Sequence, residues 1–215
     1  MNTSADAAYY IWYQAALGAG SAKLPAVLRA YRSMRRFFEA GEDARKSFGL
    51  FTPRELQLLK TTPLESAYQI LKAAKKLGYA VLVPEDGAYP VRLARIPDPP
   101  AALYVKGELP EVDEGVLVGI VGTRSATAYG HQAAFRLSYQ MAKAGAAIVS
   151  GGAVGIDSDA HAGALRAGGK TVAVLGCGID YPYLMKNGSL RELISQNGAL
   201  VSEYPPGYPP SRFTF

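Results

Sequence analysis

A glycine turn between an apolar run and a helical pattern carries the residues of this chain best suited to hold an anion. Gly122, Thr123, Arg124 and Ser125 follow the run VLVGIV. Glycine lets a ligand approach the backbone, the hydroxyls and the guanidinium donate hydrogen bonds, and the first amides of a helix are unpaired. We therefore predict a phosphate site here. The plain alternative is a tight strand-to-helix connection with an incidental surface arginine.

Strands and helices must alternate to position this turn. From Gly115 the apolar pattern predicts strands near 116–121, 146–149, 171–175 and 199–202, and helices near 128–144, 157–167 and 189–196. Such alternation is typical of a parallel sheet with right-handed crossovers. VLVGIV is apolar enough for a strand that is covered on both faces. In the first helix, Ala134, Leu137, Met141 and Ala144 predict a core stripe.

Two more glycine-rich segments follow the second and third predicted strands. Ser150, Gly151 and Gly152 end the second, and GCGID follows the third. Ligands of open α/β sheets lie outside the carboxyl ends of the strands, so these segments suggest backbone clearance for something bound. Lys186 and Asn187 could reach the same edge as Arg124, although a plain polar loop explains them nearly as well.

Several other site types are excluded. The G-x-G-x-x-G fingerprint and the acidic residue of a dinucleotide site are missing. Asp157 and Asp159 begin the second predicted helix and would repel a phosphate there, so the anion belongs to the first loop. Ser150, Asp157 and His161 make no recognisable triad, and His161 is expected to be packed. Two histidines and one cysteine leave no zinc set. We expect no catalytic residue, metal or cofactor.

The first part of the chain has a different character. Residues 8–76 lack strand signals and predict a small helical domain at 1–77. Residues 78–114 predict an extended, proline-rich connector with strands, and 115–215 the α/β domain. The turn at 18–20 is loosely similar to a helix-hairpin-helix turn, and an ordinary helix connection is the alternative.

Composition sets wider bounds. The 215 residues carry a net charge of +5, which favours anionic partners. Arginines bunch at 29–36 and lysines at 72–76, as they do on many solvated helix faces. The single cysteine and the lack of an early apolar stretch predict a cytoplasmic protein with no membrane association.

Beside this reading, the chain resembles the bacterial DNA-processing protein A (DprA, Smf-type) family. The resemblance covers roughly residues 85–210. It rests on V-G-[ST]-R-x-x-[ST]-x-Y-G at 121–130, I-V-S-G-x-A-x-G-I-D-x-x-A-H-x-G-A-L at 148–165, V-L-G-C-G-[IL]-D at 174–180, and SEYPPG at 202–207.

The resemblance implies a SAM-like helical domain followed by a Rossmann-like domain. It implies binding of single-stranded DNA without catalysis, and loading of a RecA-type recombinase during natural transformation. By position, Arg124 contacts DNA phosphate, Gly122, Thr123 and Ser125 shape the pocket, and Lys186 and Asn187 supply further contacts. The family also forms homodimers. Because this chain stops at Phe215, before the family's later strands, we expect an incomplete sheet, reduced stability and a doubtful dimer.

Two other functions stay open. The run GGAVG at 151–155 also resembles the glycine loop of lysine-decarboxylase-like phosphoribohydrolases, which cleave nucleoside monophosphates, but the P-G-G-x-G-T-x-x-E signature of those enzymes is missing. Alternatively, Tyr9, Trp12 and Tyr13 could anchor a protein partner, although such residues pack cores at least as often.

Overall fold

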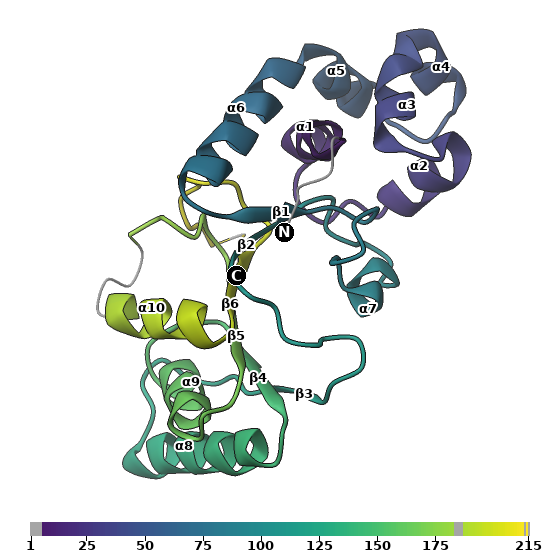
Figure 1. Ribbon diagram of the computed structural model, residues 1–215. Coiled ribbons are helices and arrows are strands. Elements are labelled where there is room, and N and C mark those ends of the chain that lie inside the picture. Colours follow the sequence, from purple (N-terminus) through teal and green to yellow (C-terminus); the bar gives the residue numbers. More distant parts are fainter. Residues whose placement is uncertain (1–5, 183–186, 213, 215) are drawn as a thin grey trace. The chain divides into compact units, whose positions relative to one another are not determined.

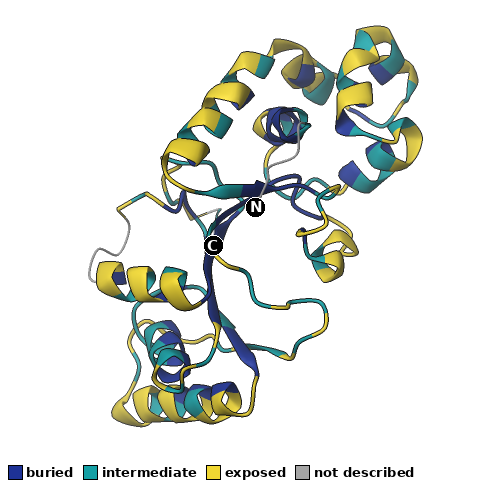
Figure 2. Ribbon diagram, in the orientation of Figure 1, coloured by how far each residue is buried: buried dark blue, intermediate teal, exposed yellow. Residues whose placement is uncertain are grey.

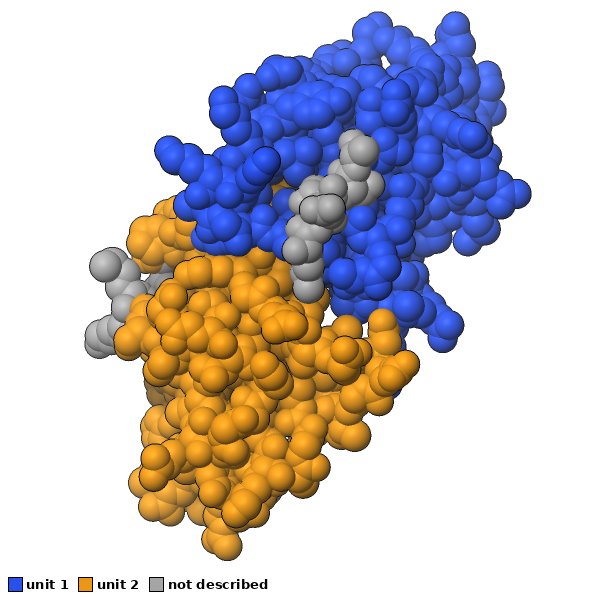
Figure 3. All heavy atoms as spheres, viewed as in Figure 1, with its two compact units in different colours: residues 1–103 blue, residues 104–215 orange. Residues whose placement is uncertain are grey.

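The chain forms two compact units, Met1–Leu103 and Tyr104–Phe215 (Figure 3). The computed structural model describes residues 6–182, 187–212 and 214. The division falls inside the stretch 78–114, which the sequence analysis treats as a connector. That stretch holds β1 (Ala80–Leu82), β2 (Leu103–Gly107) and a short helix, α7 (Val91–Ala94), which ends before the prolines at 97, 99 and 100.

The first unit is helical up to residue 76, as predicted. Its helices are α1 (Ala7–Leu17), α2 (Leu24–Tyr31), α3 (Met34–Glu39), α4 (Gly41–Ser47), α5 (Pro53–Thr61) and α6 (Leu64–Lys76). Helix α1 is buried along most of its length, and the other helices surround it (Figures 1 and 2).

Aromatic side chains of α1 form the core of this unit. Trp12 and Tyr13 have no exposed surface, and Trp12 Nε1 donates a hydrogen bond to the Thr62 carbonyl at 2.9 Å. The Phe38 ring lies edge-on to Trp12, with 4.9 Å between ring centroids. Trp12 and Tyr13 therefore stabilise the fold. Of the three residues that could anchor a protein partner, Tyr9 is the one that is partly exposed.

The turn after α1 does not offer a clear phosphate site. A Cβ placed on Gly20 would lie 3.9 Å from a carboxylate oxygen of Asp98. The nearby Lys23 ammonium is held by Glu55 at 2.6 Å, and this ion pair, with Thr52, lowers the pKa of Glu55 to about 2. A carboxylate beside the turn and a neutralised lysine favour the ordinary helix connection.

The second unit is the predicted α/β layer. Its further elements are β3 (Leu117–Gly119), α8 (Ala128–Lys143), β4 (Ala147–Ser150), α9 (Ile156–Arg166), β5 (Thr171–Leu175), α10 (Gly188–Asn197) and β6 (Ala199–Ser202). The strands lie in the order β2-β6-β5-β4-β3. β3, β4, β5 and β6 are parallel, with Val118 opposite Ile148 and Val172 opposite Ala199, and β2 is antiparallel to β6.

The expectation that VLVGIV is covered on both faces is wrong. β3 is the last strand in the sheet order, and the flanking Val116 and Val121 are 66% and 78% exposed. From β3 to β6 the chain moves across the sheet in one direction. Right-handed crossovers then place every connecting helix on the same face, as α8, α9 and α10 lie in Figure 1.

The predicted core stripe of α8 is only partly right. Ala134 is buried, but Leu137 is 54% exposed. The buried face instead carries Ala134, Ser138 and Ala142, which are four residues apart. Small side chains are needed there because α9 comes close: a Cβ on Gly163 would lie 2.4 Å from the Phe135 carbonyl oxygen.

His161 is a packed histidine, as expected. Its ring has no exposed surface, and its Nδ1 lies 2.7 Å from Thr171 Oγ1, which itself donates to the Ile148 carbonyl. Nδ1 therefore carries the proton, and Nε2 has no hydrogen-bond partner among the described residues. Desolvation by burial lowers the pKa of His161 to about 4.

This burial predicts acid sensitivity. Between pH 6.5 and pH 4 the unfolded chain takes up a proton at His161 that the folded chain refuses, so stability falls as the pH falls. We expect the free energy of unfolding to drop by about 2 kcal/mol between pH 7 and pH 5 from this group alone. Urea unfolding at both pH values checks this. A His161→Gln variant should lose most of that difference, and an unchanged difference would contradict the assignment.

Candidate anion site

A cavity of about 200 Å³ opens at the carboxyl ends of β3, β4 and β5, which is the edge that the sequence analysis predicts. Three predicted residues line it: Gly122, Arg124 and Gly151. The rest of the lining consists of Val121, Ala153, Asp157, Val174, Leu175, Gly176, Cys177 and Arg191.

The first loop is ordered by hydrogen bonds within the second unit. Ser125 N–H donates to Thr123 Oγ1 at 3.1 Å, and Thr127 caps α8 by accepting from Gly130 N–H at 3.2 Å. The threonine cap satisfies one of the helix-start amides that the sequence analysis assigns to a phosphate. The hydroxyl of Thr123 is likewise used within the loop. Of the four predicted residues in this loop, Gly122 and Arg124 line the cavity.

Gly155 lets the first loop lie against the start of α9. Its φ is +87°, and an added Cβ would lie 2.4 Å from the Thr123 carbonyl oxygen and 2.9 Å from the Arg124 Cα. The Ile156 amide donates to the same Thr123 carbonyl at 3.3 Å. The backbone of Arg124 is thus positioned by a contact that only glycine permits.

Ser150 faces inward. Its side chain is 3% exposed, and Oγ donates to the Ile120 carbonyl at 2.6 Å, which joins the ends of β3 and β4. Gly152 is buried, with a φ of +69°. Of the predicted second-loop residues, only Gly151 reaches the cavity.

Asn187 braces this same loop. Its side-chain amide donates to the Gly152 carbonyl at 3.2 Å and to Ser158 Oγ at 2.9 Å, and the residue is 8% exposed. Ser158 Oγ in turn donates to the Ala153 carbonyl at 2.6 Å. Lys186 lies outside the described residues. Contact of Asn187 or Lys186 with DNA stays a prediction.

Arg191 is the cavity residue that the sequence analysis missed. It lies in the first turns of α10, where the residues Ser189-Leu190-Arg191-Glu192 have the sequence pattern of a capping box. That box is not formed: Asn187 occupies the N-cap position without a side-chain cap, and Glu192 accepts from Lys106 Nζ at 2.7 Å. The sequence feature that could have pointed to Arg191 is its position in the helix that follows the third glycine-rich loop.

Two arginines and one aspartate are the charged residues in the lining of the cavity. Arg191 Nε is buried without a hydrogen-bond partner among the described atoms. Burial raises the pKa of the Cys177 thiol, and the neighbouring Arg191 guanidinium opposes that shift. Asp157 is 7% exposed and accepts from the Ala153 amide at 3.3 Å. Two guanidinium groups and one carboxylate leave an excess of positive charge, which suits an anion.

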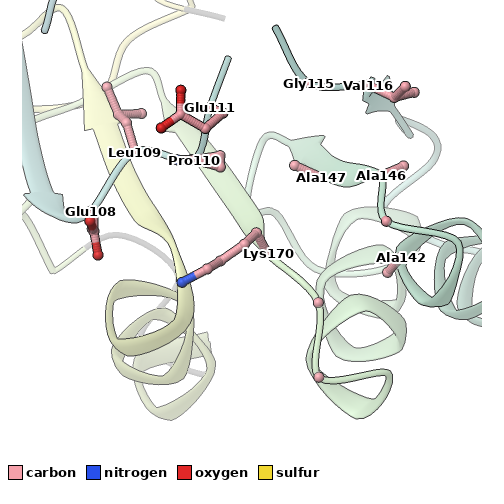
Figure 4. Close-up of a pocket in the computed structure, with 13 residues that line it drawn as sticks. Glu108, Leu109, Pro110, Glu111, Gly115, Val116, Ala142, Ala146, Ala147 and Lys170 are labelled. Atoms are coloured by element: carbon pink, nitrogen blue, oxygen red, sulfur yellow. The ribbon is translucent and has the colours of Figure 1, made fainter.

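A larger cavity, of about 500 Å³, lies where β3, β4 and β5 begin (Figure 4). Small residues such as Ala146 and Ala147 form part of its wall, and the charged groups are Glu108, Glu111 and Lys170. Two carboxylates against one ammonium disfavour a phosphate. None of the predicted site residues lines this larger cavity. The volume of a cavity by itself therefore does not identify the anion site.

Among the residues that the structure describes, no three histidine, cysteine or acidic side chains are grouped so that they could hold a metal ion. Within the same residues, no helix has the length and apolar character needed to cross a membrane.

The second unit is thus an α/β layer of Rossmann-like type, with a mostly parallel sheet and an arginine-lined cavity at the carboxyl ends of its strands. The family model described as DNA recombination-mediator protein A matches residues 80–215. The chain belongs to this family.

Individual relatives agree with the family match. The chain is 42% identical to Protein Smf of Synechocystis over 151 residues, which are 69% of this chain and 38% of that protein. It is 36% identical to DNA processing protein DprA of Bacillus subtilis over 147 residues, or 68% of this chain and 50% of that protein. The chain thus spans half or less of the length of these relatives.

Two solved structures are similar. DNA processing protein A of Streptococcus pneumoniae matches with a TM-score of 0.76 and 25% identity, covering 100% of this chain and 72% of that chain. DNA processing protein A of Helicobacter pylori, described for its single-stranded DNA binding mode, matches with a TM-score of 0.57 and 36% identity, covering 64% of this chain and 60% of that chain. These likenesses confirm the predicted α/β fold class with a mainly parallel sheet, and the family resemblance. The SAM-like character of the helical part stays a prediction.

Proposed function

We propose that this chain binds the phosphate backbone of single-stranded DNA in the cavity lined by Arg124 and Arg191. The observation that carries the proposal is that Arg124 and Arg191, from separate segments of the chain, both line one cavity with glycine-rich walls at the carboxyl edge of the sheet. Guanidinium groups pair well with phosphate, and glycine lets a bulky chain approach the backbone. The single-stranded DNA binding described for the Helicobacter pylori relative supports the choice of ligand.

Two exposed apolar residues, one in the cavity lining and one at the start of α8, suit a single strand. Val121 lines the cavity and is 78% exposed, and Tyr129, in the first turn of α8, is 81% exposed. Bases of a single strand stack on exposed aromatic rings with little sequence preference. Tyr129, five residues after Arg124 in the chain, is the exposed ring that we propose for stacking with a base.

We further propose that this binding serves recombination, with a RecA-type recombinase loaded onto the bound strand in the cytoplasm during natural transformation, and that no catalysis is involved. The family description as a recombination mediator supports this role over the phosphoribohydrolase alternative. Strand exchange by a RecA-type recombinase, measured with and without the chain, tests the loading. Release of adenine from AMP would contradict the absence of catalysis.

Direct binding is tested by fluorescence anisotropy with labelled oligo-dT at two salt concentrations. We expect binding that weakens steeply with salt, because each phosphate contact releases a counterion. Binding that is absent at low salt, or that does not depend on salt, would contradict the proposal.

Arg191→Gln tests the cavity arginine that was not predicted from the sequence. We expect the affinity for oligo-dT to fall roughly fivefold, because one cavity cation is removed while the side chain stays polar. Arg166→Gln is the matched control: it removes an equal charge from the last turn of α9, where that helix leads away from the cavity toward β5. Equal losses in both variants would mean that only net charge matters.

A further inference from the structure

Three arginines of the helical unit lie close together in the sequence and are exposed. Arg29 is in the last turn of α2, Arg32 is its C-cap, and Arg36 is in α3. No hydrogen bond or ion pair joins their guanidinium groups to any described residue. We call these three residues the arginine surface. The segment from 29 to 36 contains no acidic residue.

Three other cations of this unit, Arg35, Lys60 and Arg45, have partners. Arg35 pairs with Glu39 at 2.8 Å, and Lys60 pairs with Glu42 at 3.1 Å. Arg45 is 8% exposed and donates to the Gly41 carbonyl at 2.9 Å. The arginine surface therefore keeps its charge available to a partner from outside the chain.

Arg32 adds an independent observation. Its φ of +68° makes it the one residue other than glycine with a positive φ among the described residues. A left-handed residue after a helix is usually glycine or asparagine, because a Cβ strains this conformation. A strained backbone at an exposed arginine is the kind of outlier that motivates the hypothesis of a role for its side chain outside the fold.

We propose that the arginine surface is a second contact for the phosphate backbone of single-stranded DNA, outside the cavity. Three guanidinium groups within eight residues can contact successive phosphates, and such contacts do not depend on base sequence. The inference rests on the proposed function, since it concerns the same ligand. It predicts that a strand long enough to reach both sites binds more tightly than one that fills the cavity alone.

The test uses the full chain and two lengths of labelled oligo-dT, about six and about thirty nucleotides. In the triple variant R29Q/R32Q/R36Q we expect affinity for the long strand to fall at least about tenfold, and the slope of log affinity against log salt to become shallower by about 2. Affinity for the short strand should stay within about twofold. K72Q/K75Q/K76Q, which removes the same charge from exposed positions of α6, is the control and should change neither affinity by more than about threefold.

A single variant separates strain from function. Arg32→Gly removes the guanidinium and also relieves the left-handed backbone, so the melting temperature should stay equal or rise while affinity for the long strand falls. Unchanged long-strand affinity in Arg32→Gly and in the triple variant, or equal losses in the lysine control, would overturn the arginine surface. If Arg124→Ala keeps full affinity while the triple variant loses it, the cavity proposal is wrong and the arginine surface stands.

Discussion

Replacing Gly155 with alanine should lower the free energy of unfolding by about 3 kcal/mol and weaken DNA binding as well. The residue has a φ of +87° and a ψ of −134°, which suit glycine and strain any residue with a Cβ. The new Cβ would also lie 2.4 Å from the Thr123 carbonyl oxygen. A Cβ and a backbone carbonyl oxygen cannot be separated by rotating a side chain. The loop that carries Arg124 therefore has to move. Chemical denaturation and oligo-dT titration measure the two effects.

Gly168→Ala is the control for backbone strain alone. Gly168 follows the other end of α9 with a φ of +71°, and an added Cβ would meet nothing within 4 Å. We expect a loss of about 1 kcal/mol and no change in DNA affinity. If Gly155→Ala and Gly168→Ala behave alike, the contact between Gly155 and the first loop does not position Arg124.

The second large effect concerns Arg124 itself. Arg124→Ala should weaken binding of oligo-dT about tenfold or more at moderate salt, and by a similar factor for mixed sequences, because phosphate contacts carry no sequence information. The slope of log affinity against log salt should become shallower by about 0.7. Thermal unfolding should barely change, since the residue is exposed.

Arg136→Ala is matched to this variant in charge and exposure, and lies in α8 outside the cavity lining. We expect it to bind within about twofold of the parent. Parent-like binding by Arg124→Ala would remove Arg124 from the site. A loss confined to one base sequence would indicate base recognition in place of phosphate contact.

Local patterns in the sequence predicted the elements of the second unit closely. The predicted strand at 171–175 and the predicted helix at 128–144 agree with β5 (Thr171–Leu175) and α8 (Ala128–Lys143). Apolar runs bounded by glycines specify such elements through contacts between residues near in sequence. The same patterns placed Gly122, Arg124 and Gly151 at one edge of the sheet, since all parallel strands end there.

Contacts between distant residues decided the rest. The face of α8 that is buried depends on how closely α9 approaches it. The exposure of β3 depends on its position at the end of the strand order in the sheet. Arg191 enters the cavity because α10 packs beside β5 and β6, and no spacing in the sequence reports that packing. The amino-acid sequence by itself determined the order of elements and the glycine-lined edge, because those depend on neighbouring residues. The tertiary structure alone decided which cations face the cavity and which polar groups brace it, because burial and hydrogen bonding join residues far apart in the chain.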